Sequence, residues 1–141
     1  MAVYEKPNQD DCLGLINAEH EFYSYLKHVF FRTKGALYAV LSVDNVYVSA
    51  LRLEPYKDGM LLEALETRQK LRQQGYATKL LEYVKAKLTA GKYRKIYSHI
   101  KHDNKCSVSF HLKCGFLRIS DHALMIDGSY LSEYGTYLLE V

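Results

Sequence analysis

The sequence predicts an α/β fold built on one mixed sheet, and three features support this prediction. Apolar, β-branched and aromatic residues fill two runs within 36–56, a pattern typical of paired strands. A third strand-like run at 60–67 precedes a helical repeat of apolar residues at 77–88. Because Lys95–Ile100 is a further strand, the order strand, helix, strand predicts a right-handed crossover and a parallel pair of strands.

The N-terminal half is predicted to hold a short strand, a helix and an antiparallel meander. The strand covers Ala2–Lys6 and stops at Pro7, after which Asn8–Asp11 offer capping oxygens for a helix. The helix is defined by residues at helical intervals, namely Leu13, Ile16, His20 and Tyr23. Turn signals at 44–45 and 57–59 then separate strands at 36–43, 46–56 and 60–67. On the last of these, Glu63 is expected to share a face with Leu61, Leu65 and Thr67.

The C-terminal half is predicted to alternate helices and strands. The helix within 77–88 shows one apolar face, and Gly91 lies just beyond its end. Asn104 can cap a short helix over Lys105–Lys113 that Gly115 ends. Two long strands, Phe116–Ile126 and Tyr130–Val141, complete the sheet.

Composition limits the classes of protein to which the chain can belong. Its 141 residues fit one domain, 1–141, and the net charge of +3 is well below the basic footprint of a nucleic-acid-binding protein. Three cysteines without a C-x-x-C pair argue against a disulfide framework. No apolar run approaches the ~20 residues of a membrane span. These features predict a cytoplasmic protein.

The most informative segment is the turn that joins the strand ending at Thr67 to the following helix. Arg72–Ala77 opens that helix, whose first turn has unsatisfied N–H donors and the positive end of the helix dipole. Such a terminus can hold a pyrophosphate, and Gly75 lets the backbone approach the phosphates without a Cβ in the way. Nearby Arg68 and Lys70 add positive charge.

Two segments carry a family resemblance. Arg72 to Ala77 resembles motif A of the GNAT superfamily of N-acyltransferases, R/Q-x-x-G-x-G/A. The segment from Asn104 to Phe116 is similar to motif B, N-x-x-A-x-x-L-Y-x-x-x-G-F. Here the motif B positions hold Asn104, Ser107, Phe110, His111, Gly115 and Phe116. The two motifs occur in the family's order and separation, whereas residues 1–59 match the family only in outline.

The resemblance implies a GNAT fold of about seven strands with helices on both faces. The central parallel strands, 60–67 and 95–100, would splay apart into a slot that admits acetyl-CoA from one side and an amine from the other. Acetyl-CoA would be the co-substrate, and no metal is implied. The residues implied to contact coenzyme A are Leu65, Glu66, Thr67, Arg72, Gln73, Gln74, Gly75, Tyr76, Ala77, Thr78 and Asn104.

The catalytic residues are less clear, because the chain has His111 where the family frequently has a tyrosine that protonates the departing thiolate. A histidine can donate that proton, but a helix histidine packed beside Phe110 is an equal alternative.

His99 takes the position of a glutamate base in relatives that resemble protein N-terminal acetyltransferases. Glu63 is a rival base, and either group can accept a proton from the amine. A metal site of His99, His102, Cys106 and His111 is disfavoured by its ligand spacing.

These features predict an N-acetyltransferase that moves an acetyl group directly from acetyl-CoA to a primary amine of a small molecule, protein or peptide. The loss of the usual tyrosine keeps a second reading open, in which the domain binds coenzyme A but is weakly active or inactive. A nucleic-acid-binding domain is disfavoured, because no R-G-F-x-F-type signature occurs. The expected partners are acetyl-CoA and the amine, without nucleic acid or membrane. A terminal strand can also pair across a homodimer.

Overall fold

A computed structural model describes residues 2–5, 24, 28, 36–89 and 94–141. The chain divides into two compact units. Unit 1 comprises Met1–Glu54 and Glu63–Lys87, and unit 2 comprises Pro55–Leu62 and Leu88–Val141. The helix predicted from Leu13 to Tyr23 lies outside the described residues.

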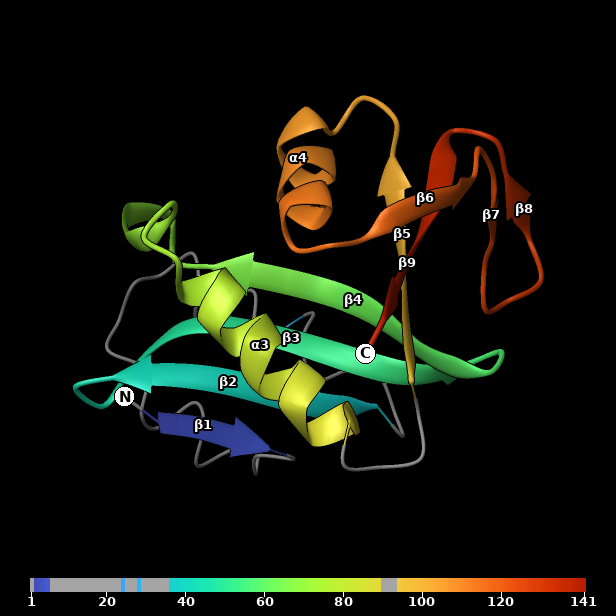
Figure 1. Ribbon diagram of the computed structural model, residues 1–141. Helices are drawn as coiled ribbons and strands as arrows, with labels where there is room; N and C mark the ends of the chain where they lie inside the picture. Colours follow the sequence, from blue (N-terminus) through green and yellow to red (C-terminus); the bar gives the residue numbers. More distant parts are fainter. Residues whose placement is uncertain (1, 6–23, 25–27, 29–35, 90–93) are drawn as a thin grey trace. The chain divides into compact units, whose positions relative to one another are not determined.

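The strands follow the hydrogen-bonded order β1-β2-β3-β4-β5-β9-β6 in a seven-stranded sheet, and β7 and β8 form a separate pair (Figure 1). The predicted parallel pair is confirmed, since Met60–Leu62 of β4 pair in parallel with Ile96–Ser98 of β5. Antiparallel pairs flank it in both units. The fold is therefore the mixed α/β class that the sequence predicts.

Unit 1 is a meander of strands and one long helix. Its elements are β1 (Ala2–Glu5), β2 (Leu37–Val43), β3 (Val46–Tyr56, whose last two residues belong to unit 2), the Glu63–Thr67 part of β4 (Gly59–Thr67), a 3-10 helix (Gln69–Leu71) and α3 (Tyr76–Thr89). Asp44 and Asn45 both have positive φ, 52° and 63°, as the two-residue turn of a hairpin requires. The core of this unit contains side chains with at most 1% exposure: Val40, Leu41, Tyr47, Leu51, Leu80 and Leu81.

Unit 2 contains the parallel pair and the second helix. Its remaining elements are β5 (Lys95–Lys101), α4 (Lys105–Lys113), β6 (Leu117–Ser120), β7 (Ala123–Leu124), β8 (Tyr130–Leu131) and β9 (Tyr134–Glu140). The start of β4 lies close to β5, because a Cβ added to Gly59 would be 2.3 Å from the carbonyl oxygen of Lys95. Glycine is therefore required where this parallel pair begins.

The prediction of two long C-terminal strands is wrong, because each is interrupted. Residues 116–126 divide into β6 and β7, and residues 130–141 divide into β8 and β9. His102 connects the two breaks, since its Nε2–H donates to the carbonyl oxygens of Asp121 at 2.9 Å and Ser132 at 3.1 Å. This long-range imidazole contact bridges the two breaks, and no local pattern reveals it.

The N-terminal strand is described over Ala2–Glu5, and the predicted boundary at Lys6 lies outside the described residues. In the part of the chain that the structure describes, no helix is both long and apolar enough to cross a bilayer.

Candidate functional site

The turn before α3 in unit 1 has the backbone geometry of an anion-binding loop. Gln73 and Gly75 have positive φ, 64° and 84°, and α3 begins at the next residue, Tyr76. The carbonyl of Gly75 accepts from Lys79 N–H at 3.0 Å, so the N–H groups of Tyr76, Ala77 and Thr78 precede the intrahelical ladder. No acidic residue lies in the first turn of α3. The terminus therefore combines available N–H donors with the positive end of the helix dipole, which no carboxylate in the first turn offsets.

Gly75 leaves open space in front of this terminus. A Cβ placed on Gly75 would meet no heavy atom within 4 Å. The residue is glycine because of its φ of 84°, and its missing side chain also leaves a surface that a phosphate can approach. The turn thus fits the pyrophosphate that the sequence predicts.

Of the two arginines near the turn, Arg72 anchors it to the end of β4. Arg72 donates through Nε to the Thr67 carbonyl at 3.1 Å and through Nη2 to the Glu66 carboxylate at 2.8 Å. Arg68 is buried at 4% exposure, and its Nε donates to the Tyr47 carbonyl. Arg68 therefore belongs to the core of unit 1 and does not supply the surface charge expected from the sequence, whereas Lys70 is exposed.

The end of β4 is tied to β3 by a serine. Ser49 Oγ donates to the Glu66 carbonyl at 3.0 Å and lies 2.9 Å from Thr67 Oγ1. Further back in β4, Ala64 has φ of 51°, which interrupts the regular strand alternation expected for 60–67. Leu65, Glu66 and Thr67 therefore form a short, fixed segment between this irregular residue and the helix turn.

Glu63 lies in an environment that favours its protonated form. Its Oε2 is 3.5 Å from Arg52 Nη2, and both side chains are largely buried, at 25% and 14% exposure. Burial, reinforced by the neighbouring Glu54 carboxyl, raises the pKa of Glu63 to about 7, although Arg52 acts in the opposite direction. Glu63 can therefore exchange a proton near neutral pH.

His99 lies on β5 in unit 2, beside aromatic side chains. Its ring is 5.3 Å from that of Tyr56, at an interplanar angle of 82°. Its buried Nε2 has no hydrogen-bond partner among the described residues. Burial lowers the pKa of His99 below its usual 6.5, and the Lys57 ammonium lowers it further. The imidazole is neutral at pH 7 and has a nitrogen that can accept a proton.

His111 lies on α4 and is almost fully buried, at 4% exposure. Its Nδ1–H donates to the Ser107 carbonyl at 2.7 Å, so its Nε2 accepts from the Ser98 hydroxyl at 3.0 Å. The ring also makes an edge contact with Phe116 at 4.9 Å. Burial lowers the pKa of His111, although the hydrogen bond to Ser107 opposes this shift. These contacts favour the packing alternative for His111 over proton donation.

The two histidines contact opposite faces of β5. His111 bonds to Ser98, and consecutive strand residues point to opposite faces of a sheet. His99 therefore points away from α4, toward the face that carries Tyr56 and Tyr97. Unit 2 thus provides one histidine on each side of a single strand.

Asn104 caps α4 as the sequence predicts. Its Oδ1 accepts from Ser107 N–H at 3.2 Å.

The predicted site residues are divided between the two units. Unit 1 contains Glu63, Leu65–Thr67 and Arg72–Thr78, and unit 2 contains His99, Asn104 and His111. Four further residues shape the surroundings of Glu63 and His99 through contacts that a linear pattern does not reveal: Arg52, Glu54, Tyr56 and Lys57.

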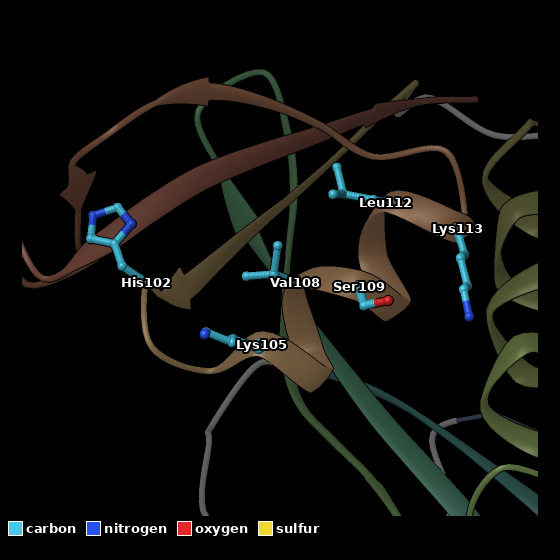
Figure 2. Close-up of a pocket in the computed structure, with 6 residues that line it drawn as sticks. All are labelled: His102, Lys105, Val108, Ser109, Leu112 and Lys113. Atoms are coloured by element: carbon cyan, nitrogen blue, oxygen red, sulfur yellow. The ribbon is translucent and has the colours of Figure 1, made fainter.

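A surface depression of about 440 Å³ lies along α4 (Figure 2). Figure 2 shows two lysines and two aliphatic side chains projecting from the helix on this side. The residues that line the depression are His102, Lys105, Val108, Ser109, Leu112 and Lys113. None of these six belongs to the predicted set. Within the described residues, no three His, Cys, Asp or Glu side chains gather as a metal site.

The acetyltransferase (GNAT) family model matches residues 4–116, a span that includes both the anion-binding turn and α4. The chain belongs to the acetyltransferase (GNAT) family. Membership makes it an acetyltransferase of EC class 2.3.1 and confirms the resemblance on which the sequence analysis depends. No curated protein matches the chain significantly.

Solved structures of GNAT proteins share the fold. The PaiA N-acetyltransferase of Thermoplasma acidophilum, in complex with coenzyme A, has a TM-score of 0.70 at 12% identity, with all of both chains covered. The ribosomal-protein-alanine N-acetyltransferase of Brucella melitensis gives 0.68 at 13%, again with all of both chains covered. A GNAT family acetyltransferase of Elizabethkingia anophelis with acetyl-CoA bound gives 0.66 at 15%, covering 99% of this chain and 97% of that one. At these identities the likeness supports the fold alone.

His111→Phe is expected to destabilise the protein more than it slows catalysis. The phenyl ring cannot accept from the Ser98 hydroxyl or donate to the Ser107 carbonyl, and a lost partner for a buried polar group costs about 1–3 kcal/mol. Urea unfolding should report this loss, while kcat of the folded fraction should fall less than about threefold, below the effect of removing a proton donor. A large fall in kcat with unchanged stability would restore His111 as the acid.

Proposed function

We propose that the chain is an N-acetyltransferase that moves an acetyl group from acetyl-CoA directly to a primary amine of a small molecule, protein or peptide. The observation that supports this proposal most strongly is the turn before α3. Its Gly75 has φ of 84°, open space where a Cβ would be, and no acidic residue in the helix turn that follows. Related structures with coenzyme A or acetyl-CoA bound add support.

The proposal assigns the binding residues of unit 1 to the coenzyme. Backbone N–H groups of Gln73–Thr78 bind the pyrophosphate, while Arg72 fixes the turn through its bonds to Glu66 and Thr67. Leu65, Glu66 and Thr67 present backbone groups to the pantetheine. In unit 2, Asn104 is assigned to the coenzyme through the second motif, in addition to its role as the cap of α4.

The base assigned to the amine is His99, and Glu63 is the rival. The neutral His99 imidazole accepts the proton that the amine loses before or during attack on the thioester carbonyl. On the other face of β5, His111 serves the packing of α4. No histidine then protonates the departing thiolate. Positioning of amine and thioester supplies the remaining rate gain.

The odd cysteine count supports a cytoplasmic location.

Two measurements test the proposed function together. Calorimetry should detect acetyl-CoA binding with one site per chain. A panel of small amines and peptide N-termini should give thiol release and N-acetylated product with at least one acceptor. Binding of acetyl-CoA without turnover on any acceptor would favour the inactive coenzyme-binding module. The absence of binding would overturn both functions.

A further inference from the structure

We propose that Tyr56 is a positioning residue that holds the His99 imidazole, within unit 2, in the orientation needed to accept a proton from the acceptor amine. This inference rests on the proposed function, since it assigns a purpose to the base side of that reaction. In the step concerned, the N–H bond of the amine breaks and an Nε2–H bond forms on His99. The imidazole becomes imidazolium and the amine nitrogen keeps the electron pair.

The Tyr56 ring is held between two side chains of the same strand face. It makes edge contacts with His99 and Tyr97, each at a centroid distance of 5.3 Å. These two residues are separated by one position on β5 and so point to the same side. Tyr56 is 7% exposed and belongs to a small core with Leu61, Tyr97 and Leu138. The ring that contacts His99 is therefore itself fixed by packing.

A hydrogen bond fixes the other end of Tyr56. Its hydroxyl donates to the Leu124 carbonyl at 2.5 Å, which ties the ring to β7. On the neighbouring strand, Thr136 pairs with His99 across the sheet and donates to the His122 carbonyl at 2.6 Å. Tyr56 and the register partner of His99 thus both bond to the same short segment, residues 122–124. The Tyr56 ring that contacts His99 is therefore fixed at both ends, while Nε2 of His99 keeps no partner among the described residues.

Charges around the ring favour its neutral form. Lys57 Nζ lies 5.4 Å from the Tyr56 ring centroid and 6.0 Å from that of Tyr97. The carboxylate of the acidic neighbour, Asp58, accepts hydrogen bonds from Lys95 Nζ at 2.8 Å and from the Tyr97 hydroxyl. The ammonium of Lys57 is thus the charge that His99 experiences most, and it opposes protonation of the imidazole in the resting enzyme.

The test compares three variants with the wild type by NMR titration of His99 in the unliganded protein and by steady-state kinetics. Tyr56→Leu removes the ring contact and the bond to Leu124, so water reaches His99, its pKa rises, and kcat falls about tenfold with KM for acetyl-CoA unchanged. Tyr56→Phe keeps the ring contact, so the pKa stays low and kcat recovers most of its value. Tyr97→Phe is the matched control: it also removes one hydroxyl from the cluster, and it leaves the His99 titration unchanged.

A fourth variant keeps the test decisive if Tyr56→Leu fails to fold. Lys57→Gln changes an exposed side chain and should raise the pKa of His99 by removing a positive neighbour. A Tyr56→Leu or Lys57→Gln protein whose His99 titrates as in the wild type would overturn the proposal. Failure of the proposed function has a different signature: no acceptor is acetylated, yet the titration shifts still occur.

Discussion

Gly75→Glu is expected to weaken acetyl-CoA binding by about 100-fold. The substituted carboxylate would lie at the positive end of α3, where the pyrophosphate is proposed to bind, and would repel it. The side chain would also fill the open space in front of the turn. Calorimetric titration of the variant with acetyl-CoA measures the effect directly.

A matched control separates this electrostatic effect from backbone strain. Gly128 also has a positive φ, 90°, and its added Cβ would likewise meet nothing within 4 Å. Gly128→Glu therefore carries the same strain, about 1–2 kcal/mol, in a turn between β7 and β8. It should unfold at a similar denaturant concentration to Gly75→Glu yet bind acetyl-CoA normally. Normal affinity in Gly75→Glu would refute the phosphate-binding role of the turn.

His99→Gln is the second substitution with a large expected effect. Glutamine retains polarity and approximate size but cannot accept a proton from the amine, so kcat should fall about 100-fold while acetyl-CoA affinity stays the same. Glu63→Gln is the comparison, because it removes the rival base and conserves shape. If Glu63→Gln loses the activity and His99→Gln keeps it, the assignment of the base is reversed.

The pH dependence of kcat/KM distinguishes the same two groups. A base must be unprotonated, so activity falls on the acidic side of its pKa. With His99 as base the fall is centred below pH 6.5, because burial and Lys57 lower the pKa of this imidazole. With Glu63 as base it is centred at about 7, the value to which burial and Glu54 raise its pKa. A fall centred near 7 that disappears in Glu63→Gln would exclude His99.

The parts of the fold that local sequence determines were predicted closely. The turn before α3 depends on Gly75 and a helix start, and the cap of α4 depends on Asn104, so neighbouring residues specify both. The division of the two C-terminal strands could not be predicted from local patterns, because the contact that bridges both breaks comes from His102, which is remote in sequence. Ala64 interrupts β4 although alanine carries no signal for a positive φ.

The same distinction between local sequence and long-range contacts applies to the candidate site. The residues proposed to bind the coenzyme, apart from Asn104, lie within 65–78 and form a recognisable pattern. The chemistry of the candidate bases depends instead on partners from other strands: Arg52 and Glu54 for Glu63, and Tyr56 with Lys57 for His99. Sequence spacing alone left the histidine roles open, and the hydrogen bonds of His111 now favour packing.

The arrangement of β5 has a consequence for engineering this enzyme. Ser98 serves the helix side of the strand, and the adjacent His99 serves the aromatic side, so the two environments can be varied separately. Substitutions at Ser98 should therefore change how α4 packs against β5 while leaving the ring contact between Tyr56 and His99 in place.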